Sequence, residues 1–156
     1  DKSKDDRFPK NKWQKIKQQP EIIIFEGWCV GAKPQKKKYL KKSINILEEK
    51  HDTNLIWRSR VNYELHNEYA EIFSKIDRLI FLKVPNFECV YKWRLLQEKK
   101  LQLTSKSKKI MSPAQIKNFI MYYERITKQM LVGLTKRAYA VLYLDKKHRF
   151  NKIKFN

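Results

Sequence analysis

A carboxylate follows directly after the most hydrophobic short run near the start of the chain. Residues 22–25 are three isoleucines and a phenylalanine, and Glu26 comes next. A short, continuous, β-branched run predicts a buried strand, here Glu21 to Phe25. In open α/β sheets, ligands bind at the carboxyl ends of the strands. We therefore expect Glu26 to face a crevice, where it acts near Mg²⁺ or orients a nucleophile. A solvated acid in a turn fits the same pattern, and Trp28 fits either a pocket wall or the core.

A polar loop, Asp1 to Trp13, precedes this strand and contains further charged candidates. Asp1 and Asp6 are of the residue type that accepts a proton from a substrate hydroxyl. Arg7 is of the type that clamps a carboxylate or a phosphate through two parallel hydrogen bonds. The alternative is an ordinary solvated, charged loop.

The stretch from Cys89 to Lys100 places Arg94, Gln97 and Glu98 at helical spacing. One interpretation is a simple ion pair between Arg94 and Glu98, four residues apart on one helix face. The functional interpretation makes Arg94 a lid arginine that meets a phosphoryl group during its transfer. The basic segment that follows, residues 104–109, would suit a lid that closes over ATP.

The chain is strongly basic, with 36 Lys and Arg against 16 Asp and Glu and a net charge of +20. Such a charge favours anionic partners, either nucleic acid or phosphorylated ligands, although a general bias toward lysine produces it equally well. The aromatic residues do not alternate with the basic runs as base-stacking platforms would. We therefore expect small-molecule partners and no nucleic acid.

The apolar runs and the cysteines indicate a protein without a membrane span. The longest apolar run, Ala138 to Leu144, is far shorter than the roughly 20 residues that a spanning helix needs. Cys29 and Cys89 lie far apart and have no partners at metal-ligand spacing, which predicts buried free thiols in a reducing, cytoplasmic compartment.

Buried runs alternate with helical patterns along the chain, which predicts an α/β fold with a parallel sheet covered by helices on both faces. Besides Glu21–Phe25, we expect strands at Asp77–Val84 and Arg137–Asp145, the latter ending in a second strand-end acid. Expected helices are Leu40–Lys50, Asn54–Lys75, Phe87–Leu101 and a last one that begins at the capping box Ser112–Gln115 and buries Ile116, Phe119, Ile120 and Tyr123.

Several of these segments together resemble the D-glycerate 3-kinase family. They are "DKS" and "DR.P" near the start, "IIIFEGWCVG.KP", "VYKWRLLQE", "MS..QI..F" and "VLYLD", in the family's order from residue 1 to about 145. This family belongs to the P-loop kinases, near uridine kinase, pantothenate kinase and phosphoribulokinase. The resemblance implies a P-loop NTPase-like, three-layer fold and the transfer of the ATP γ-phosphate to a hydroxyl of glycerate, with Mg²⁺.

The resemblance also implies roles on the substrate side of the reaction. Asp1 would contact or deprotonate the substrate hydroxyl, and Lys2 beside it would face anionic groups. Arg7 would bind the substrate carboxylate, and Trp28 would help to form the substrate pocket.

On the phosphoryl side, the resemblance makes Glu26 the strand-end acid that acts near Mg²⁺ or its water. Arg94 would be the lid arginine and, with Gln97, would contact ATP. A Glu26 side chain in bulk solvent, away from any nucleotide pocket, would contradict this assignment.

Three departures from the family pattern are informative. The sequence contains no G-x-x-x-x-G-K-[ST] phosphate loop, the loop between Ser3 and Asp6 is short, and Tyr122 stands where the family has an arginine. We expect residues 1–156 to be the C-terminal part of a single P-loop kinase domain, without its first strand, and not to bind ATP alone. An upstream segment or another chain would fill the place of that strand.

Other functions remain open from the sequence. The same fold would serve a kinase with another acceptor, namely a nucleoside, pantothenate or a sugar. Different in class are a non-catalytic basic module that binds nucleic acid and a degenerate scaffold that lost its phosphate loop.

Overall fold

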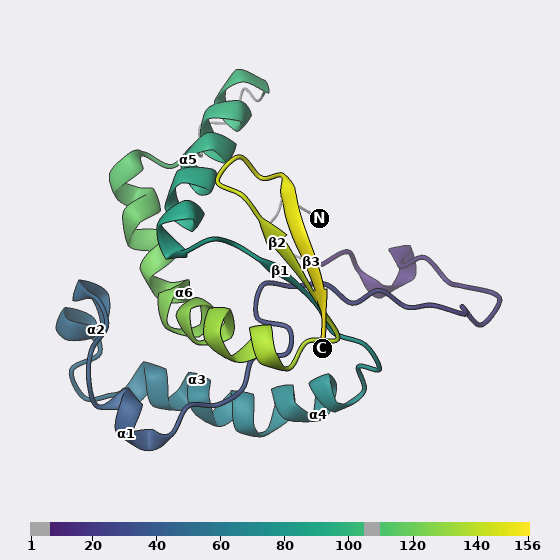
Figure 1. Cartoon of the computed structure of the whole chain (residues 1–156), viewed down its shortest axis with the longest axis horizontal. Helices are drawn as coiled ribbons and strands as arrows, with labels where there is room; N and C mark the ends of the chain where they lie inside the picture. Colours follow the sequence, from purple (N-terminus) through teal and green to yellow (C-terminus); the bar gives the residue numbers. More distant parts are fainter. Residues whose placement is uncertain (1–6, 105–109) are drawn as a thin grey trace.

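The structure, a computed structural model, describes residues 7–104 and 110–156 (Figure 1). Asp1, Lys2 and Asp6 lie outside the described residues, as does most of the predicted lid segment. The helices are η1 (Lys10–Lys12), α1 (Lys37–Leu40), α2 (Ile46–His51), α3 (Ile56–His66), α4 (Glu68–Ser74), α5 (Phe87–Thr104), α6 (Pro113–Gly133) and η2 (Leu134–Lys136). The strands are β1 (Ile80–Lys83), β2 (Ala140–Leu144) and β3 (Phe150–Phe155).

The sheet is mixed, and the all-parallel prediction is wrong in this respect. β1 and β2 are parallel, with Ile80 opposite Ala140, as the buried runs predicted. β3 was not predicted and pairs antiparallel to β2 in a hairpin. Every residue of β3 is exposed, so this edge strand lacks the continuous apolar run that marks a buried strand.

The predicted strand Glu21–Phe25 does not form in the described residues. Ile22, Ile23 and Ile24 are 78%, 80% and 86% exposed, and the segment belongs to no strand of the sheet. A strand exists through ladder hydrogen bonds to a neighbour. No described segment pairs with these residues. Their β-branched composition alone is therefore not enough to form a strand.

Helices α5 and α6 lie next to each other beside the sheet (Figure 1). The core forms where α6 and η2 meet β1 and α3. Its buried centre is Ala32, Leu65, Met130 and Leu134, against which Cys29, Phe73, Leu79, Phe81 and Ile126 pack. On β1, the alternate residues Ile80 and Leu82 are more than half exposed, so the prediction of a strand buried on both faces is wrong for β1 as described.

Local sequence signals predicted where helices lie, but they did not predict where the helices are interrupted. The capping box at α6 is confirmed, because Ser112 Oγ accepts from Gln115 N at 3.3 Å and Gln115 Oε1 accepts from Ser112 N at 2.8 Å. The predicted long helix Asn54–Lys75 is wrong, because it breaks at Asn67 (φ −107°, ψ −98°) into α3 and α4. There the Asn67 side chain donates to Tyr63 O, competing with the helix as short polar side chains do. The predicted helix Leu40–Lys50 forms only from Ile46 onward, as α2, because α1 ends at Leu40 and residues 41–45 are not helical.

The turn that follows Trp28 brings the early chain against the core. Gly31 adopts φ +77°, which glycine reaches without strain. A Cβ at this position would stand 2.6 Å from Leu79 Cδ2. The glycine therefore permits both the turn and the close approach to the start of β1. None of the helices in the described ranges is both long enough and apolar enough to cross a membrane.

Candidate functional site

A cavity of about 420 Å³ lies between α5, α6, β1 and the turn at Trp28, and we call it the aromatic cavity. It brings together Trp28 and Arg94, two residues that the sequence proposed as site residues from segments far apart. Leu82 and Val84 also line it, so it lies at the carboxyl end of β1. This is the edge of a parallel sheet at which ligands bind in α/β proteins.

Three aromatic rings form one side of this cavity. The Trp28 ring meets the Tyr123 ring edge-on, with centroids 4.8 Å apart and planes at 79°. Phe119 packs on Tyr123 with centroids 4.9 Å apart. Edge-on aromatic pairs are favourable beyond their buried area, so these rings hold the Trp28 turn against α6. The sequence assigned Phe119 and Tyr123 to the core, and only their i,i+4 spacing signalled that they act together.

Arg94 is held from two sides by neighbours on α5. Its Nη1 donates to Gln97 Oε1 at 2.6 Å, and its Nη2 pairs with Glu98 Oε1 at 2.6 Å. Its guanidinium lies 5.5 Å from the Phe119 ring centroid, within range of a cation–π interaction. Its Nε is buried and has no hydrogen-bond partner among the described residues. The result is a positive charge that is fixed in place at the cavity.

Glu98 anchors this arginine to the next helix. The residue is only 4% exposed, and its Oε2 accepts from Met111 N at 3.1 Å. Met111 immediately precedes the Ser112 cap of α6, so one carboxylate joins Arg94, α5 and the start of α6. The predicted Arg94–Glu98 ion pair is confirmed. The lid role of Arg94 stays a prediction, as does ATP contact by Gln97, whose side-chain oxygen is engaged with Arg94.

The two predicted strand-end acids differ. Glu26 follows no strand in the described residues, is exposed and does not line the aromatic cavity, although it lies two residues from Trp28. This is the arrangement named above as contradicting its role near Mg²⁺, so that role stays a prediction that requires a further segment to cover Glu26. Asp145 follows β2 but does not line the aromatic cavity, and its carboxylate is engaged within the turn that follows the strand. Its Oδ1 accepts from Lys147 N at 2.7 Å and from Arg149 N at 2.9 Å. Hydrogen bonding, first of all by the Arg149 backbone, lowers the pKa of the Asp145 carboxyl.

The remaining predicted site residues are not brought to the aromatic cavity by the described structure. Arg7 is exposed and is not among the lining residues, and Asp1 and Lys2 lie outside the described ranges. Within residues 7–104 and 110–156, no group of three or more His, Cys, Asp or Glu side chains is arranged to hold a metal ion.

Comparisons with known proteins identify relatives of this chain. It is 33% identical over 120 residues to uncharacterized kinase mug58 of Schizosaccharomyces pombe. The aligned region covers 76% of this chain and 41% of that protein. It is 26% identical over 118 residues to the chloroplastic D-glycerate 3-kinase of Arabidopsis thaliana. That alignment covers 76% of this chain and 23% of the plant protein. This chain is a relative of the D-glycerate 3-kinases. The resemblance noted in the sequence is thereby confirmed, although a search with protein-family models found no match.

The fold of this glycerate-kinase relative is also found among solved structures. The D-glycerate 3-kinase from Cryptococcus neoformans superposes with a TM-score of 0.68 at 18% identity, covering 90% of this chain and 52% of that one. The mixed sheet and its helices thus match part of the fold of that kinase. The chain spans less than half the length of the two curated relatives.

Proposed function

We propose that this chain is the C-terminal part of a P-loop kinase that transfers the γ-phosphate of ATP to a hydroxyl of glycerate. One observation carries the proposal. In a relative of D-glycerate 3-kinases, the aromatic cavity combines Trp28 with an anchored arginine, Arg94, at the carboxyl end of β1.

Arg94 suits phosphoryl transfer because its charge is held in place before reaction. In this chemistry negative charge spreads over the oxygens of the transferring group, and catalysis consists mainly of positioning and electrostatic stabilisation. Glu98 and Gln97 bind two of the guanidinium nitrogens, which fixes the positive charge where it would face a phosphoryl oxygen in the cavity. We assign Gln97 and Glu98 to positioning and Arg94 to contact with the reacting group.

The substrate side is assigned to the segments around Trp28. Trp28 would cover the glycerate carbon chain, and Arg7 would bind its carboxylate bidentately. Asp1 would accept the proton of the attacking hydroxyl, and Lys2 would attract anionic groups nearby.

Nucleotide binding requires more than the described residues. Because they contain no cluster of metal-binding side chains, the magnesium ion expected with ATP would take its ligands mainly from the phosphates, with Glu26 as the carboxylate that this chain contributes. The phosphate loop would come from a segment upstream of this sequence.

Exposed apolar residues and an unpaired strand edge support the place we propose for that upstream segment. Ile22, Ile23 and Ile24 are exposed, and β1 pairs with β2 along one edge while its other edge pairs with no described strand. A strand inserted between them would bury this surface and satisfy the edge hydrogen bonds. Activity would then require the complete protein.

An acceptor panel tests the proposal. The complete protein is assayed for ADP formation with ATP and Mg²⁺ and, in turn, D-glycerate, uridine, pantothenate and a pentose phosphate. We expect the highest kcat/KM with D-glycerate, and no turnover by residues 1–156 alone, which serve as the matched control. Preference for another acceptor would reassign the substrate, and no ADP formation with any acceptor would refute the kinase proposal.

A further inference from the structure

Phe119 lies in the proposed site but has no assigned role in it. The helical pattern after the Ser112 cap predicted a core position for this residue. In the structure it lies on α6 with 36% of its surface exposed, and it lines the aromatic cavity. Packing in a core therefore does not account for Phe119, and its contacts have to be considered one by one.

The Phe119 ring holds the Arg94 guanidinium from a helix other than its own. The guanidinium carbon lies over the ring, 5.5 Å from its centroid, within the roughly 6 Å range of a cation–π interaction. Gln97 and Glu98, which bind the two terminal nitrogens, lie on α5 together with Arg94. The ring lies on α6, so this contact fixes the position of the charge relative to the second helix.

An aromatic ring suits this task because it holds a cation without neutralising it. Glu98 carries a full negative charge and partly cancels the charge of Arg94. The face of a phenylalanine ring attracts a cation through its quadrupole, although the ring has no net charge. The Arg94 side chain is 29% exposed and lines the cavity. Its charge therefore stays in place and remains effective toward an anionic group in the cavity.

The contacts of Phe119 continue along the cavity wall to Trp28. The centroid of the Tyr123 ring lies 4.9 Å from that of Phe119 and 4.8 Å from that of Trp28. Phe119 and Tyr123 are four residues apart and therefore neighbours on one side of α6. Trp28 belongs to the turn that follows Glu26. One row of contacts thus joins the arginine on α5 to the turn at Trp28.

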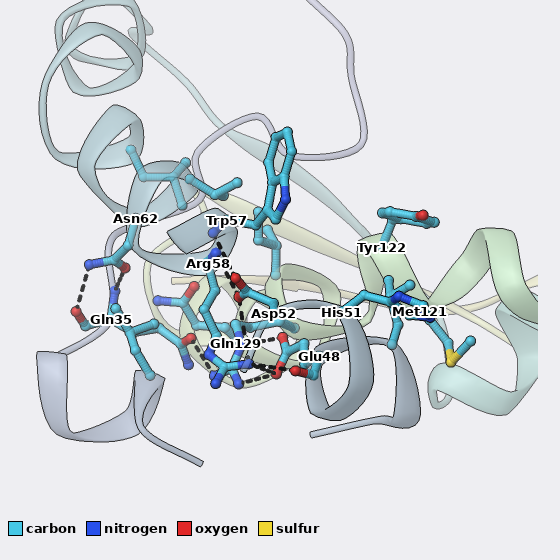
Figure 2. A pocket seen from close by; sticks show the side chains of 16 residues that line it. Gln35, Glu48, His51, Asp52, Trp57, Arg58, Asn62, Met121, Tyr122 and Gln129 are labelled. Atoms are coloured by element: carbon cyan, nitrogen blue, oxygen red, sulfur yellow. Dashed lines mark hydrogen bonds and ion pairs between the residues drawn. The ribbon is translucent and has the colours of Figure 1, made fainter. Parts of the chain in front are cut away.

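Helix α6 is a firm base for this row because its other side is tied to α2. Arg125 donates to Glu48 Oε1 at 2.6 Å and to Glu48 Oε2 at 2.5 Å. Figure 2 shows the charged cluster around Glu48, which also includes Asp52 and Arg58. With 3.6 residues per turn, Arg125 and Phe119 project from different sides of the helix. The Phe119 ring therefore projects from a helix that is fixed on its far side.

We propose that Phe119 is a positioning residue for phosphoryl transfer, whose ring face holds the Arg94 guanidinium in the orientation that meets the transferring group. The attraction acts through the electrons of the ring and not through its volume. The proposal rests on the function proposed above, because that function assigns Arg94 to the reacting group. Without the attraction, the guanidinium would spend less time in the productive orientation, and kcat would fall accordingly.

Fluorinated phenylalanines in place of Phe119 in the complete protein test the proposal. One, two and three ring fluorines withdraw electron density from the ring face in steps, at nearly constant ring size. kcat and KM are measured by ADP formation with ATP and the preferred acceptor of the panel above. We expect kcat to fall at each step, about fivefold over the series, as the cation–π attraction weakens. Both KM values should stay within about twofold, because the charge acts on the transition state.

Phe87 provides a matched control on the same two helices. Its ring on α5 lies 5.8 Å from the ammonium group of Lys128 on α6, and neither residue lines the aromatic cavity. The same fluorinated residues in place of Phe87 should leave kcat unchanged. Phe119→Tyr keeps a ring face and should retain kcat within about twofold. Phe119→Leu should lower kcat about tenfold, because it also releases the Tyr123 ring.

A double-mutant cycle measures the contact independently of activity. Arg94→Ala, Phe119→Leu and the double variant are unfolded in urea, and the coupling between the two substitutions is determined. The cycle cancels the effect of leaving Glu98 without its arginine, because that effect is common to both variants that lack Arg94. We expect a coupling of about threefold or more in the unfolding equilibrium constant.

These measurements separate failure of this proposal from failure of the proposed function. Turnover that ignores the ring fluorines but falls in Phe119→Leu would show that the ring acts by its volume, which overturns the proposal. A rise in KM at constant kcat would make Phe119 a substrate contact, and absence of coupling in the cycle would remove the contact with Arg94; either result also overturns it. If the wild type forms no ADP with any acceptor, the proposed function fails, and the positioning role fails with it even where the cycle shows coupling.

Discussion

Replacing Arg125 by alanine should loosen the segment 35–48 from α6. The guanidinium donates to both carboxylate oxygens of Glu48, at 2.6 and 2.5 Å. It also donates to Lys42 O at 2.8 Å, Tyr39 O at 3.0 Å and Gln35 Oε1 at 3.3 Å. One side chain of α6 therefore holds α1, α2 and the chain that connects them.

The expected cost follows from what remains after the substitution. Removing one partner of a buried ion pair costs about 3–5 kcal/mol. Here Glu48 keeps the Ile44 N–H at 3.0 Å and the Arg58 guanidinium at 3.5 Å, and the two released backbone carbonyls are exposed and turn to water. We therefore expect the lower limit, a loss of about 3 kcal/mol in the free energy of unfolding.

Urea unfolding followed by circular dichroism measures this loss in the complete protein. Lys128→Ala is the matched control on the same helix. Lys128 pairs with Glu124 at 2.5 Å but is half exposed, so its removal should cost less than about 0.5 kcal/mol. If Arg125→Ala costs no more than Lys128→Ala, the claim that Arg125 anchors the segment is refuted.

The pH dependence of stability gives a second test of the same contact. Burial alone raises the pKa of the Glu48 carboxyl. Hydrogen bonds from Arg125 and Ile44 N, with the charges of Arg125 and Arg58, outweigh it and lower the pKa below its usual value. A lowered native pKa stabilises the fold above the unfolded-state value of about 4.3, and the stabilisation is lost as the pH falls through the native pKa. Arg125→Ala should lose less stability over that acid range than the wild type does.

Four further substitutions test the site and the fold. Arg94→Ala in the complete protein should lower kcat at least about 100-fold with little change in KM, and an effect on KM alone would contradict its role in phosphoryl transfer. Glu26→Gln should lower turnover by about two orders of magnitude or more, whereas Glu21→Gln, the exposed control, should not; activity within about twofold would refute the role of Glu26. Ser112→Ala should cost about 1 kcal/mol of unfolding free energy by removing the α6 cap, and an unchanged urea midpoint would contradict this. Gly31→Ala should cost about 1–3 kcal/mol, because φ is +77° and Leu79 is too close; an unchanged midpoint would show that the turn tolerates a side chain.

Much of the site could be predicted because its parts are local in sequence. The spacing of Arg94 and Glu98 dictates that they meet once α5 forms, and a helix forms there from its own hydrogen bonds and apolar face. The Ser112 capping box needs only the four residues that compose it. Trp28 was proposed from its position after an apolar run, but no local signal pairs it with Tyr123.

The rest of the fold and of the site depends on contacts between residues that are distant in the sequence. The amino-acid sequence by itself determined where α5, α6, β1 and β2 lie, because each depends mainly on its own composition and caps. Whether residues 22–25 form a strand, which direction β3 takes, and which groups contact Arg58 depend on what lies beside them. Strand pairing and side-chain burial join segments distant along the chain, so only the tertiary structure set them.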